Sequence, residues 1–311
     1  MGTKRDIVAV GGSAGSFEAL KSIVQSLTRD FPGTIFVTIH QSARARSFTA
    51  EILARYTQLS TVTVTEDQAF ERGKIYVAPP DRHLMVGRDH VHLTRSPIEG
   101  LQRPSINVTF RSAAVAYGER VVGVLLSGML DDGASGLWEI ARRRGITIVQ
   151  NLDEAPFPSM PLNALKDAPV NYQLRATEIG PMLVQLASEV VEVDMPNTST
   201  EPSENANHFS GFTCPECRGP LYESTTEPLE FRCRVGHVFP LKTLLDEETG
   251  TQERKLYEAI VALEEGADLA EYAAARGVTG NGNLKKEAAQ LRSHAAAIRK
   301  LIEERLAPFL E

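Results

Sequence analysis

The chain has 311 residues, of which 42% are hydrophobic, and its formal net charge is −7. This length allows roughly two or three domains with a substantial core, and the acidic balance argues against a protein that mainly binds nucleic acid. No apolar run approaches the roughly 18–20 residues that a membrane-spanning helix needs. The N-terminal residues show no secretory signal pattern, so we expect a cytoplasmic protein without membrane insertion.

The first 190 residues alternate strand-like and helix-like segments. Strands are expected at residues 7–10, 34–39, 62–64, 75–78, 91–93, 121–126 and 146–149. Helices are expected at residues 17–27, 48–56, 106–117 and 134–144. Several strand segments are short and continuously apolar, as in parallel strands buried on both faces. The alternation predicts right-handed βαβ units and an α/β fold with a doubly wound, mostly parallel, Rossmann-like sheet. Residues 62–95 form a strand-rich excursion in which we expect an antiparallel hairpin at 85–93.

The composition changes after this first domain, for which we expect residues 1–193. Residues 194–209 are polar and rich in Pro, Ser and Asn, which is typical of a linker. A cysteine-containing module is expected at 210–245 and an α-helical hairpin at 246–311.

Heptad spacing marks the second half of the expected hairpin. The apolar positions are Leu284, Ala288, Leu291, Ala295, Ile298 and Ile302. A glycine-rich stretch at 277–283 separates this helix from the preceding one. A structural hairpin or a dimerisation element is the expected role, and self-association through these helices is one partner prediction.

The N-terminal turn carries the strongest chemical signal. An apolar β-branched run ends at Gly11-Gly12-Ser13-Ala14-Gly15 and leads directly into a helical pattern. A strand, a tight glycine turn and a helix place a serine hydroxyl above the end of a parallel sheet, beside the N–H groups of the helix N-terminus. Two interpretations compete at this point: a nucleophilic serine of the form G-x-S-x-G, or a phosphate-binding turn.

Nucleotide binding fails on two sequence criteria. A dinucleotide fold needs glycines at the first, third and sixth positions and an acidic residue after the second strand. Here Ser16 stands at the sixth position and the second strand ends in His40-Gln41 without a carboxylate. No Gly-Lys-Ser/Thr follows the turn, which excludes a Walker loop.

A nucleophilic serine needs a base and a carboxylate from other strand ends. His40 stands at the tip of the next strand, and the strand at 121–126 ends in a glycine-rich turn that contains Asp131 and Asp132. Each feature also has a plain structural interpretation: an ordinary turn, a packed histidine, or an aspartate that caps a helix. Their joint placement at successive strand ends favours the catalytic interpretation. The order Ser, His, Asp differs from that of the α/β-hydrolases.

Several ordered motifs carry a family resemblance that covers about residues 5–190. They are Gly11-Gly12-Ser13-Ala14-Gly15, Thr38-Ile39-His40, Tyr76-Val77-Ala78-Pro79-Pro80-Asp81-Arg82-His83, Arg103-Pro104-Ser105-Ile106-Asn107-Val108-Thr109-Phe110, Leu126-Ser127-Gly128-Met129-Leu130-Asp131-Asp132-Gly133-Ala134-Ser135-Gly136, Gln150-Asn151 and Met160-Pro161. Together they resemble the catalytic domain of the chemotaxis protein-glutamate methylesterases of CheB type.

The resemblance implies a serine hydrolase of signal transduction that removes methyl esters from glutamate side chains of chemoreceptor-like helices. It implies a triad of Ser13, His40 and Asp132, with oxyanion donors near Ala14 and Met129 and no cofactor for catalysis. Arg103 matches an arginine near the substrate cleft of the family, and a surface ion pair is an equal alternative. Asp131 matches a position that the family often fills with Asn.

The chain also departs from the family pattern. Ser16 replaces a second glycine, and Gln41-Ser42 replaces a Met-Pro pair after the histidine, so substrate choice is less certain than the chemistry. Family members in chemotaxis carry an N-terminal phosphoacceptor receiver domain. The catalytic pattern here begins near residue 6, so we expect no receiver domain and no gating by phosphorylation.

The three cysteines fall between residues 214 and 233, an odd and tightly clustered set that favours a metal over disulfides. Cys214, Cys217, Cys233 and His237 have the spacing C-x2-C-x15-C-x3-H, which predicts one structural Zn²⁺ in a zinc ribbon. His208 is an alternative ligand, and unpaired reduced thiols are the metal-free alternative. The module could dock a receptor tail or partner protein, or brace the hairpin against the catalytic domain.

Three functions therefore remain open on the sequence alone. The leading one is a methylesterase that acts on a methylated receptor or adaptor. The others are a non-catalytic signalling adaptor of the same fold and a glutamine deamidase at the same site, because an amide meets the same oxyanion requirements.

Overall fold

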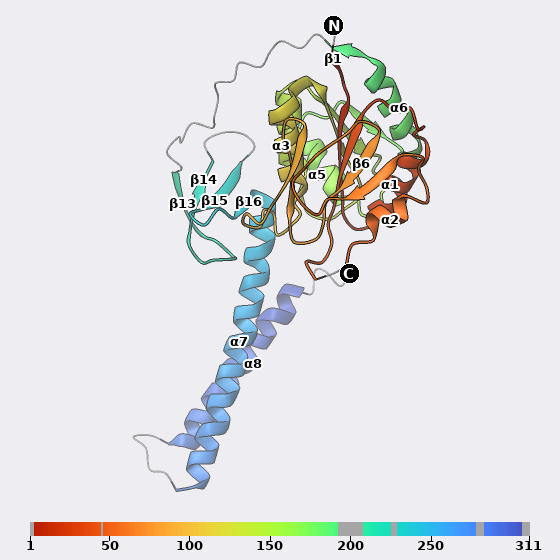
Figure 1. Cartoon of the computed structure of the whole chain (residues 1–311). Coiled ribbons are helices and arrows are strands. Elements are labelled where there is room, and N and C mark those ends of the chain that lie inside the picture. The colour runs from red at the N-terminus through yellow and green to blue at the C-terminus, as the bar shows by residue number, and fades with distance from the viewer. Residues whose placement is uncertain (1–2, 45, 192–207, 225–228, 278–282, 307–311) are drawn as a thin grey trace. The chain divides into compact units, whose positions relative to one another are not determined.

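The structure, a computed structural model, describes residues 3–44, 46–191, 208–224, 229–277 and 283–306 (Figure 1). Two compact units divide the chain, one of Met1–Leu244 and one of Leu245–Glu311. The linker expected at 194–209 lies outside the described residues as far as 207, and its last two residues begin a strand. Among the described helices, none is both long enough and apolar enough to span a bilayer.

The first unit contains all the strands of the described chain. They are β1 (Thr3–Lys4), β2 (Ile7–Gly12), β3 (Thr34–Ile39), β4 (Ser60–Thr63), β5 (Gln68–Ala69), β6 (Lys74–Val77), β7 (His83–Val86), β8 (His90–Thr94), β9 (Val121–Leu125), β10 (Ile146–Gln150), β11 (Tyr172–Leu174), β12 (Val190–Val191), β13 (His208–Thr213), β14 (Pro220–Glu223), β15 (Glu230–Cys233) and β16 (Val238–Pro240). The helices are α1 (Ser16–Gln25), α2 (Thr49–Leu53), α3 (Ile106–Tyr117), α4 (Ala134–Arg142), α5 (Ser159–Asp167), α6 (Ala176–Ser188), α7 (Leu241–Ala275) and α8 (Leu284–Leu306).

A seven-stranded sheet with the order β11-β10-β9-β2-β3-β6-β4 forms the centre of the first unit. All of its neighbouring strands pair in parallel. The doubly wound α/β fold predicted from the alternating segments is confirmed. The chain leaves β2 toward β3 on one side and returns to β9 on the other, so β2 lies at the point where the winding reverses.

Both faces of this sheet are covered by helices (Figure 1). Val8 and Val10 of β2 belong to a core that contains α1, α2 and α6. Ile7 and Ala9 of the same strand belong to a second core with α3, α4 and α5. Because side chains alternate along a strand, burial on both faces requires the continuous apolar run that the sequence shows.

The excursion after β4 folds as a small antiparallel sheet of β5, β8 and β7. The hairpin expected at 85–93 is present as β7 and β8, with Met85 opposite His92. The sequence patterns did not predict α5, β11 and α6: β11 forms one edge of the main sheet, and α5 and α6 pack on its opposite faces.

The cysteine-containing segment forms a four-stranded antiparallel sheet in the order β13-β14-β15-β16. Its small core contains Cys214, Leu221, Phe231 and Phe239, and Leu101 of the preceding domain packs against it. Helix α7 begins directly after β16, so its first residues belong to the first unit.

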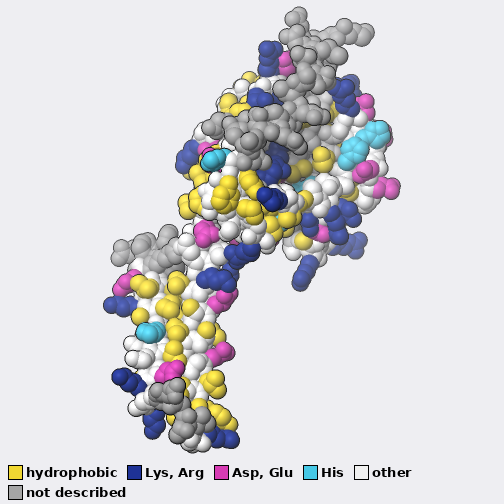
Figure 2. All heavy atoms as spheres, turned by 90° about the vertical axis from the view of Figure 1, so that its left-hand side faces the viewer, with side chains coloured by type: hydrophobic (Ala, Val, Ile, Leu, Met, Phe, Trp, Pro, Cys, Tyr) yellow, Lys and Arg dark blue, Asp and Glu magenta, His cyan; other side chains and the backbone are white. Residues whose placement is uncertain are grey.

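The second unit is an α-helical hairpin formed by the rest of α7 and by α8. Each expected heptad position of α8 is buried or half-buried, and Ile260 of α7 packs with Ala295 and Ile302. Arg299 donates to Glu264 at 2.5 Å and Arg292 donates to Asp268 at 2.9 Å, which links the two helices side by side. Figure 2 shows hydrophobic side chains along one face of the hairpin with charged ones beside them. Nothing among the described residues supports self-association through these helices.

Candidate active site and metal cluster

The carboxyl ends of β2, β3 and β9 meet at one edge of the sheet. Gly12 pairs with Ile39, and Gly11 pairs with Leu125. The residues that follow these strands therefore lie close together, at the position where doubly wound sheets bind their ligands.

Ser13 follows β2 in a turn that glycines make possible. Its N–H donates to the Ser127 carbonyl at 2.9 Å, which ties the turn to the loop after β9. Gly15, with φ of 73°, takes a left-handed conformation before α1 begins. At Gly128 a Cβ atom would lie 2.9 Å from Ser13 Cβ and 2.4 Å from Met160 Cε. Only glycine lets the two loops approach this closely.

His40 and Asp132 form a hydrogen-bonded pair across the sheet edge. The His40 Nε2 atom lies 2.7 Å from Asp132 Oδ2, and the side chains are only 9% and 3% exposed. Helix α3 anchors the carboxylate, because the N–H groups of Ile106 and Asn107 and the Ser105 hydroxyl donate to its oxygens at 2.7, 3.0 and 2.9 Å. Asp132 thus accepts hydrogen bonds at the positive end of a helix.

These contacts decide the charge of Asp132. Burial alone would raise its pKa, but the hydrogen bond from His40 and the N–H groups of Asn107 and Ile106 outweigh burial and lower the pKa below the ordinary value. An ionised Asp132 accepts from Nε2–H and leaves Nδ1 of the neutral imidazole as an acceptor.

Several groups at this edge have no hydrogen-bond partner among the described residues. They are the Ser13 hydroxyl, His40 Nδ1 and the N–H groups of Ala14 and Met129. No hydrogen bond joins Ser13 and His40 in the described part of the chain. A hydroxyl, a base and two N–H donors that are all available to a ligand are the groups that acyl transfer requires.

Arg103 is engaged by a neighbouring carboxylate. Its Nε and one guanidinium nitrogen donate to Asp81 at 2.9 and 2.6 Å, and another donates to the Ser96 carbonyl at 3.1 Å. Arg103, and to a smaller extent Arg95 and Arg82, lower the pKa of Asp81. The contacts are those of an ion pair, and a substrate role for Arg103 stays a prediction.

Two supporting groups were missed by the sequence reasoning. His83 accepts the Ser105 N–H at Nδ1 at 3.2 Å, and burial lowers its pKa, so the neutral ring holds the start of α3 against Asp132. Ser127 donates to the Ala14 carbonyl at 2.8 Å. Both residues lie inside the quoted motifs, but nothing in a linear motif tells a supporting residue from a reacting one.

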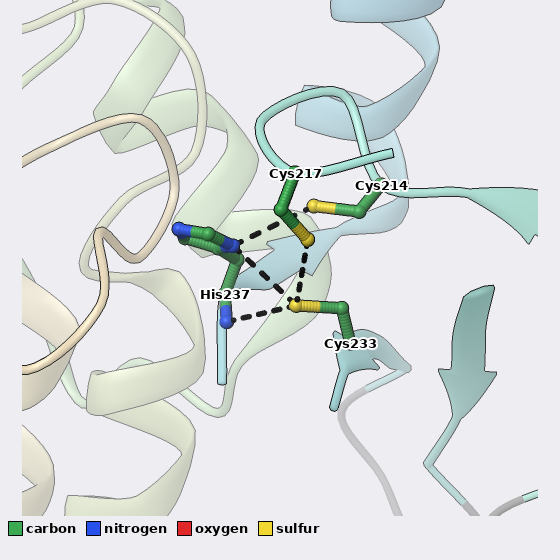
Figure 3. Close-up of side chains that lie close together, drawn as sticks. All are labelled: Cys214, Cys217, Cys233 and His237. Carbon is green, nitrogen blue, oxygen red and sulfur yellow. Dashed lines mark hydrogen bonds between the residues drawn. The ribbon is translucent and has the colours of Figure 1, made fainter. Parts of the chain in front are cut away.

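The three cysteines and His237 gather as their spacing predicts, whereas His208 is outside the cluster. Figure 3 shows the four side chains pointing toward one another from two turns. Their ligand atoms all lie within 4.8 Å of each other. Cys217 Sγ is 3.6 Å from Cys233 Sγ, and His237 Nδ1 is 3.4 Å from Cys233 Sγ and 3.7 Å from Cys214 Sγ. A tetrahedron with zinc–sulfur bonds of about 2.3 Å has edges of roughly 3.8 Å, so the residues fit a zinc ion.

The thiols differ in acidity. Burial raises the pKa of Cys214 to about 12. Burial acts in the same direction at Cys233, but hydrogen bonds that include one from the His237 backbone outweigh it and lower that pKa to about 7. A bound divalent cation favours the thiolate at every ligand position.

Comparisons with known proteins agree with the fold and with the motifs. The profile of the CheB methylesterase family, described as "CheB methylesterase", matches residues 8–183. A Leptospira interrogans protein, provisionally named protein-glutamate methylesterase/protein-glutamine glutaminase, is 30% identical over 188 residues, which are 60% of this chain and 97% of that protein. The Yersinia pestis protein-glutamate methylesterase/protein-glutamine glutaminase is 35% identical over 190 residues, which are 58% of this chain and 53% of that protein.

The solved structures include a similar domain. The crystal structure of the Thermotoga maritima CheB methylesterase catalytic domain matches with a TM-score of 0.56 and 26% identity, and the match covers 60% of this chain and all of that domain. The chain spans about half the length of the Yersinia protein and nearly all of the Leptospira protein. The family profile covers more than half of the present sequence, and the chain therefore belongs to the CheB methylesterase family.

Proposed function

We propose that this protein is a serine hydrolase that removes methyl esters from glutamate side chains of chemoreceptor-like proteins, with Ser13, His40 and Asp132 as its triad. The observation that carries the proposal is the hydrogen bond between His40 and Asp132, formed beside the Ser13 turn at the switch point of the sheet. Membership of the CheB methylesterase family and the names of the relatives support the same activity.

The proposed reaction has two steps, the acylation of Ser13 and the hydrolysis of the acyl-enzyme. The Ser13 hydroxyl attacks the ester carbonyl carbon while His40 Nδ1 takes its proton, and the imidazolium formed is stabilised by Asp132. The N–H groups of Ala14 and Met129 bind the oxyanion, a contribution of about 3–4 kcal/mol per donor in comparable sites. His40 then gives its proton to the leaving methoxide, which departs as methanol. Water, activated by His40, hydrolyses the acyl-enzyme to glutamate and restores Ser13.

Glutamine deamidation is the second candidate, because both relatives described above also carry the name protein-glutamine glutaminase. The same groups serve, with ammonia in place of methanol as the leaving group. A non-catalytic adaptor is the alternative of a different class, and the available hydroxyl, imidazole nitrogen and N–H donors argue against it.

We also propose that Cys214, Cys217, Cys233 and His237 bind one structural Zn²⁺. Four protein ligands complete a tetrahedral shell and leave no open position for catalysis. The metal would hold the two turns of a sheet that has only a small core of its own.

The decisive experiment measures methanol release from a methylated receptor by the wild type, by Ser13→Ala and by Ser22→Ala, a control serine on α1. We expect release by the wild type and the control, and a loss of about 10³-fold or more in Ser13→Ala. Methanol release by Ser13→Ala equal to that of the wild type would rule out the proposed triad. No release by the wild type or any variant would favour the adaptor. Ammonia release from the unmethylated receptor separates the deamidase activity, and mass spectrometry after a fluorophosphonate reaction should find the adduct on Ser13.

A further inference from the structure

Residues far apart in the chain meet at the loop that carries Asp132. The first turn of α7 contributes Thr243, which is fully buried and whose hydroxyl donates to Asp131 Oδ1. Its neighbour Lys242 donates to Asn163 Oδ1 at 3.1 Å, and Asn163 in turn donates to the Leu130 carbonyl at 2.5 Å. The start of α7 therefore holds two consecutive residues of this loop, one directly and one through α5.

This loop, residues 127–133, needs such support. It follows β9 and provides both the Asp132 carboxylate and the Met129 N–H. Leu130 has a φ of 65°, a conformation that costs free energy for a residue with a side chain. Asp131 is 4% exposed, and Thr243 gives this buried carboxylate two donors, its hydroxyl and its backbone N–H. Without the hydroxyl, Asp131 loses one of the hydrogen bonds that compensate its burial, and this loss favours loop conformations in which water reaches the carboxylate.

The four-stranded sheet β13-β14-β15-β16, together with its cluster of Cys214, Cys217, Cys233 and His237, is called the cysteine–histidine module below. This module fixes where α7 starts. Val238, the residue after the ligand His237, accepts the Gly100 N–H at 2.9 Å. On β15, Glu230 accepts the Ser135 hydroxyl at 2.5 Å and lies 3.5 Å from Arg111, which also pairs with Glu99 at 2.6 Å. Strand β16 is thus attached to the catalytic domain on one side and to the cluster on the other, and α7 continues directly from it.

We propose that Thr243 is a positioning residue for the Asp132 loop and that the cysteine–histidine module holds Thr243 in place. Loss of the module should therefore lower kcat. The proposal rests on the proposed function only for its kinetic consequence. Thr243 touches neither substrate nor the reacting atoms. It acts through Asp131 on the conformation that brings Asp132 to His40.

The test compares Thr243→Val, which keeps the shape and removes the hydroxyl, with Thr243→Ser, which keeps the hydroxyl. Thr249→Val is the matched control, because Thr249 is an exposed threonine of the same helix whose hydroxyl donates to the Leu245 carbonyl. Methyl-ester hydrolysis gives kcat and KM, and hydrogen exchange followed by mass spectrometry reports on residues 127–133 in the full chain. Exchange outside the loop shows whether a variant remains folded.

We expect Thr243→Val to lower kcat by about tenfold with little change in KM, because a displacement of a catalytic group by about 1 Å can cost up to roughly a hundredfold. Exchange in 127–133 should accelerate selectively, Thr243→Ser should restore both readouts, and Thr249→Val should change neither. Removing metal from the wild type with a chelator should accelerate exchange in the same loop.

Unchanged loop exchange in Thr243→Val, an equal effect in Thr249→Val, or no response of the loop to metal removal would each overturn the proposal. Failure of the proposed function looks different, because activity would then not depend on Ser13. The hydrogen-exchange comparison would still decide the role of Thr243 in that case.

Discussion

The carboxylate of Asp132 both anchors the start of α3 and orients the His40 imidazole. It accepts hydrogen bonds from two N–H groups and a hydroxyl at the start of α3, and it accepts from His40 Nε2. The acceptors that anchor α3 thus also set the tautomer of the imidazole. A rigid helix end orients a catalytic group more exactly than a flexible side chain could.

Substitution of Asp132 should therefore affect activity and stability together. In Asp132→Asn the amide nitrogen must replace one acceptor oxygen, and it opposes an N–H donor. We expect kcat to fall by about 10⁴-fold, as in a comparable triad, and the free energy of unfolding to fall by about 1–3 kcal/mol for the unsatisfied donor. Methanol release and urea unfolding measure the two effects. A variant with wild-type turnover would contradict the assignment of Asp132.

The pKa of Asp131 is shifted in the direction opposite to that of Asp132, and this shift predicts a dependence of stability on pH. Burial and the neighbouring charge of Asp132 raise its pKa, and the hydrogen bonds from the Thr243 hydroxyl and N–H and the charge of Lys242 offset this only in part. A carboxyl group with a raised folded pKa destabilises the fold when ionised, above that pKa, and the penalty is absent below the unfolded pKa. Asp131→Asn, which keeps an oxygen acceptor for Thr243, should raise the free energy of unfolding at neutral pH, and the gain should shrink on acidification.

Urea unfolding across a pH series measures this difference. Asp30→Asn, at an exposed aspartate, is the matched control and should show no such gain. A lower stability of Asp131→Asn than of the wild type at neutral pH would show that the charge of Asp131 is favourable.

At the scale of elements, the cysteine–histidine module depends on its two turns. The first lies between β13 and β14, and the second lies between β15 and β16. The core of the module is small, so much of its stability should come from the metal.

Cys214→Ser tests this dependence. Elemental analysis should find one zinc per chain in the wild type and a substoichiometric amount in the variant, because the serine hydroxyl is a poor zinc ligand. Thr213→Ser, next to it and exposed, should keep the full metal content. Equal zinc in Cys214→Ser and the wild type would exclude Cys214 as a ligand.

The helical hairpin shows how far a local pattern can predict an element. The heptad of α8 predicted its buried face correctly, since a repeat of apolar residues at this spacing keeps one seam against a partner helix. The helices α5 and α6 escaped prediction. Both contain proline, at Pro161 and Pro181, and proline argues locally against a helix even where tertiary packing retains it.

At the scale of the whole molecule, the fold class followed from the sequence because buried parallel strands and amphipathic helices have distinct periods. The order of the strands did not follow from it. Local propensity does not determine whether β9 lies beside β2 or at an edge of the sheet. The pairing of β9 with β2 is what brings the loop of Asp132 to the Ser13 turn.

The sequence by itself determined the alternating architecture, the family motifs, the reactive residue types and the ligand spacing of the cluster, because each is written in neighbouring residues. Only the tertiary structure decided which distant groups meet. His40 reaches Asp132 across 92 positions, and Thr243 reaches Asp131 across 112. Such contacts depend on chain topology and on the burial of unrelated surfaces, which no local pattern records. For this reason the link from the cysteine–histidine module to the catalytic loop emerged only from the folded chain.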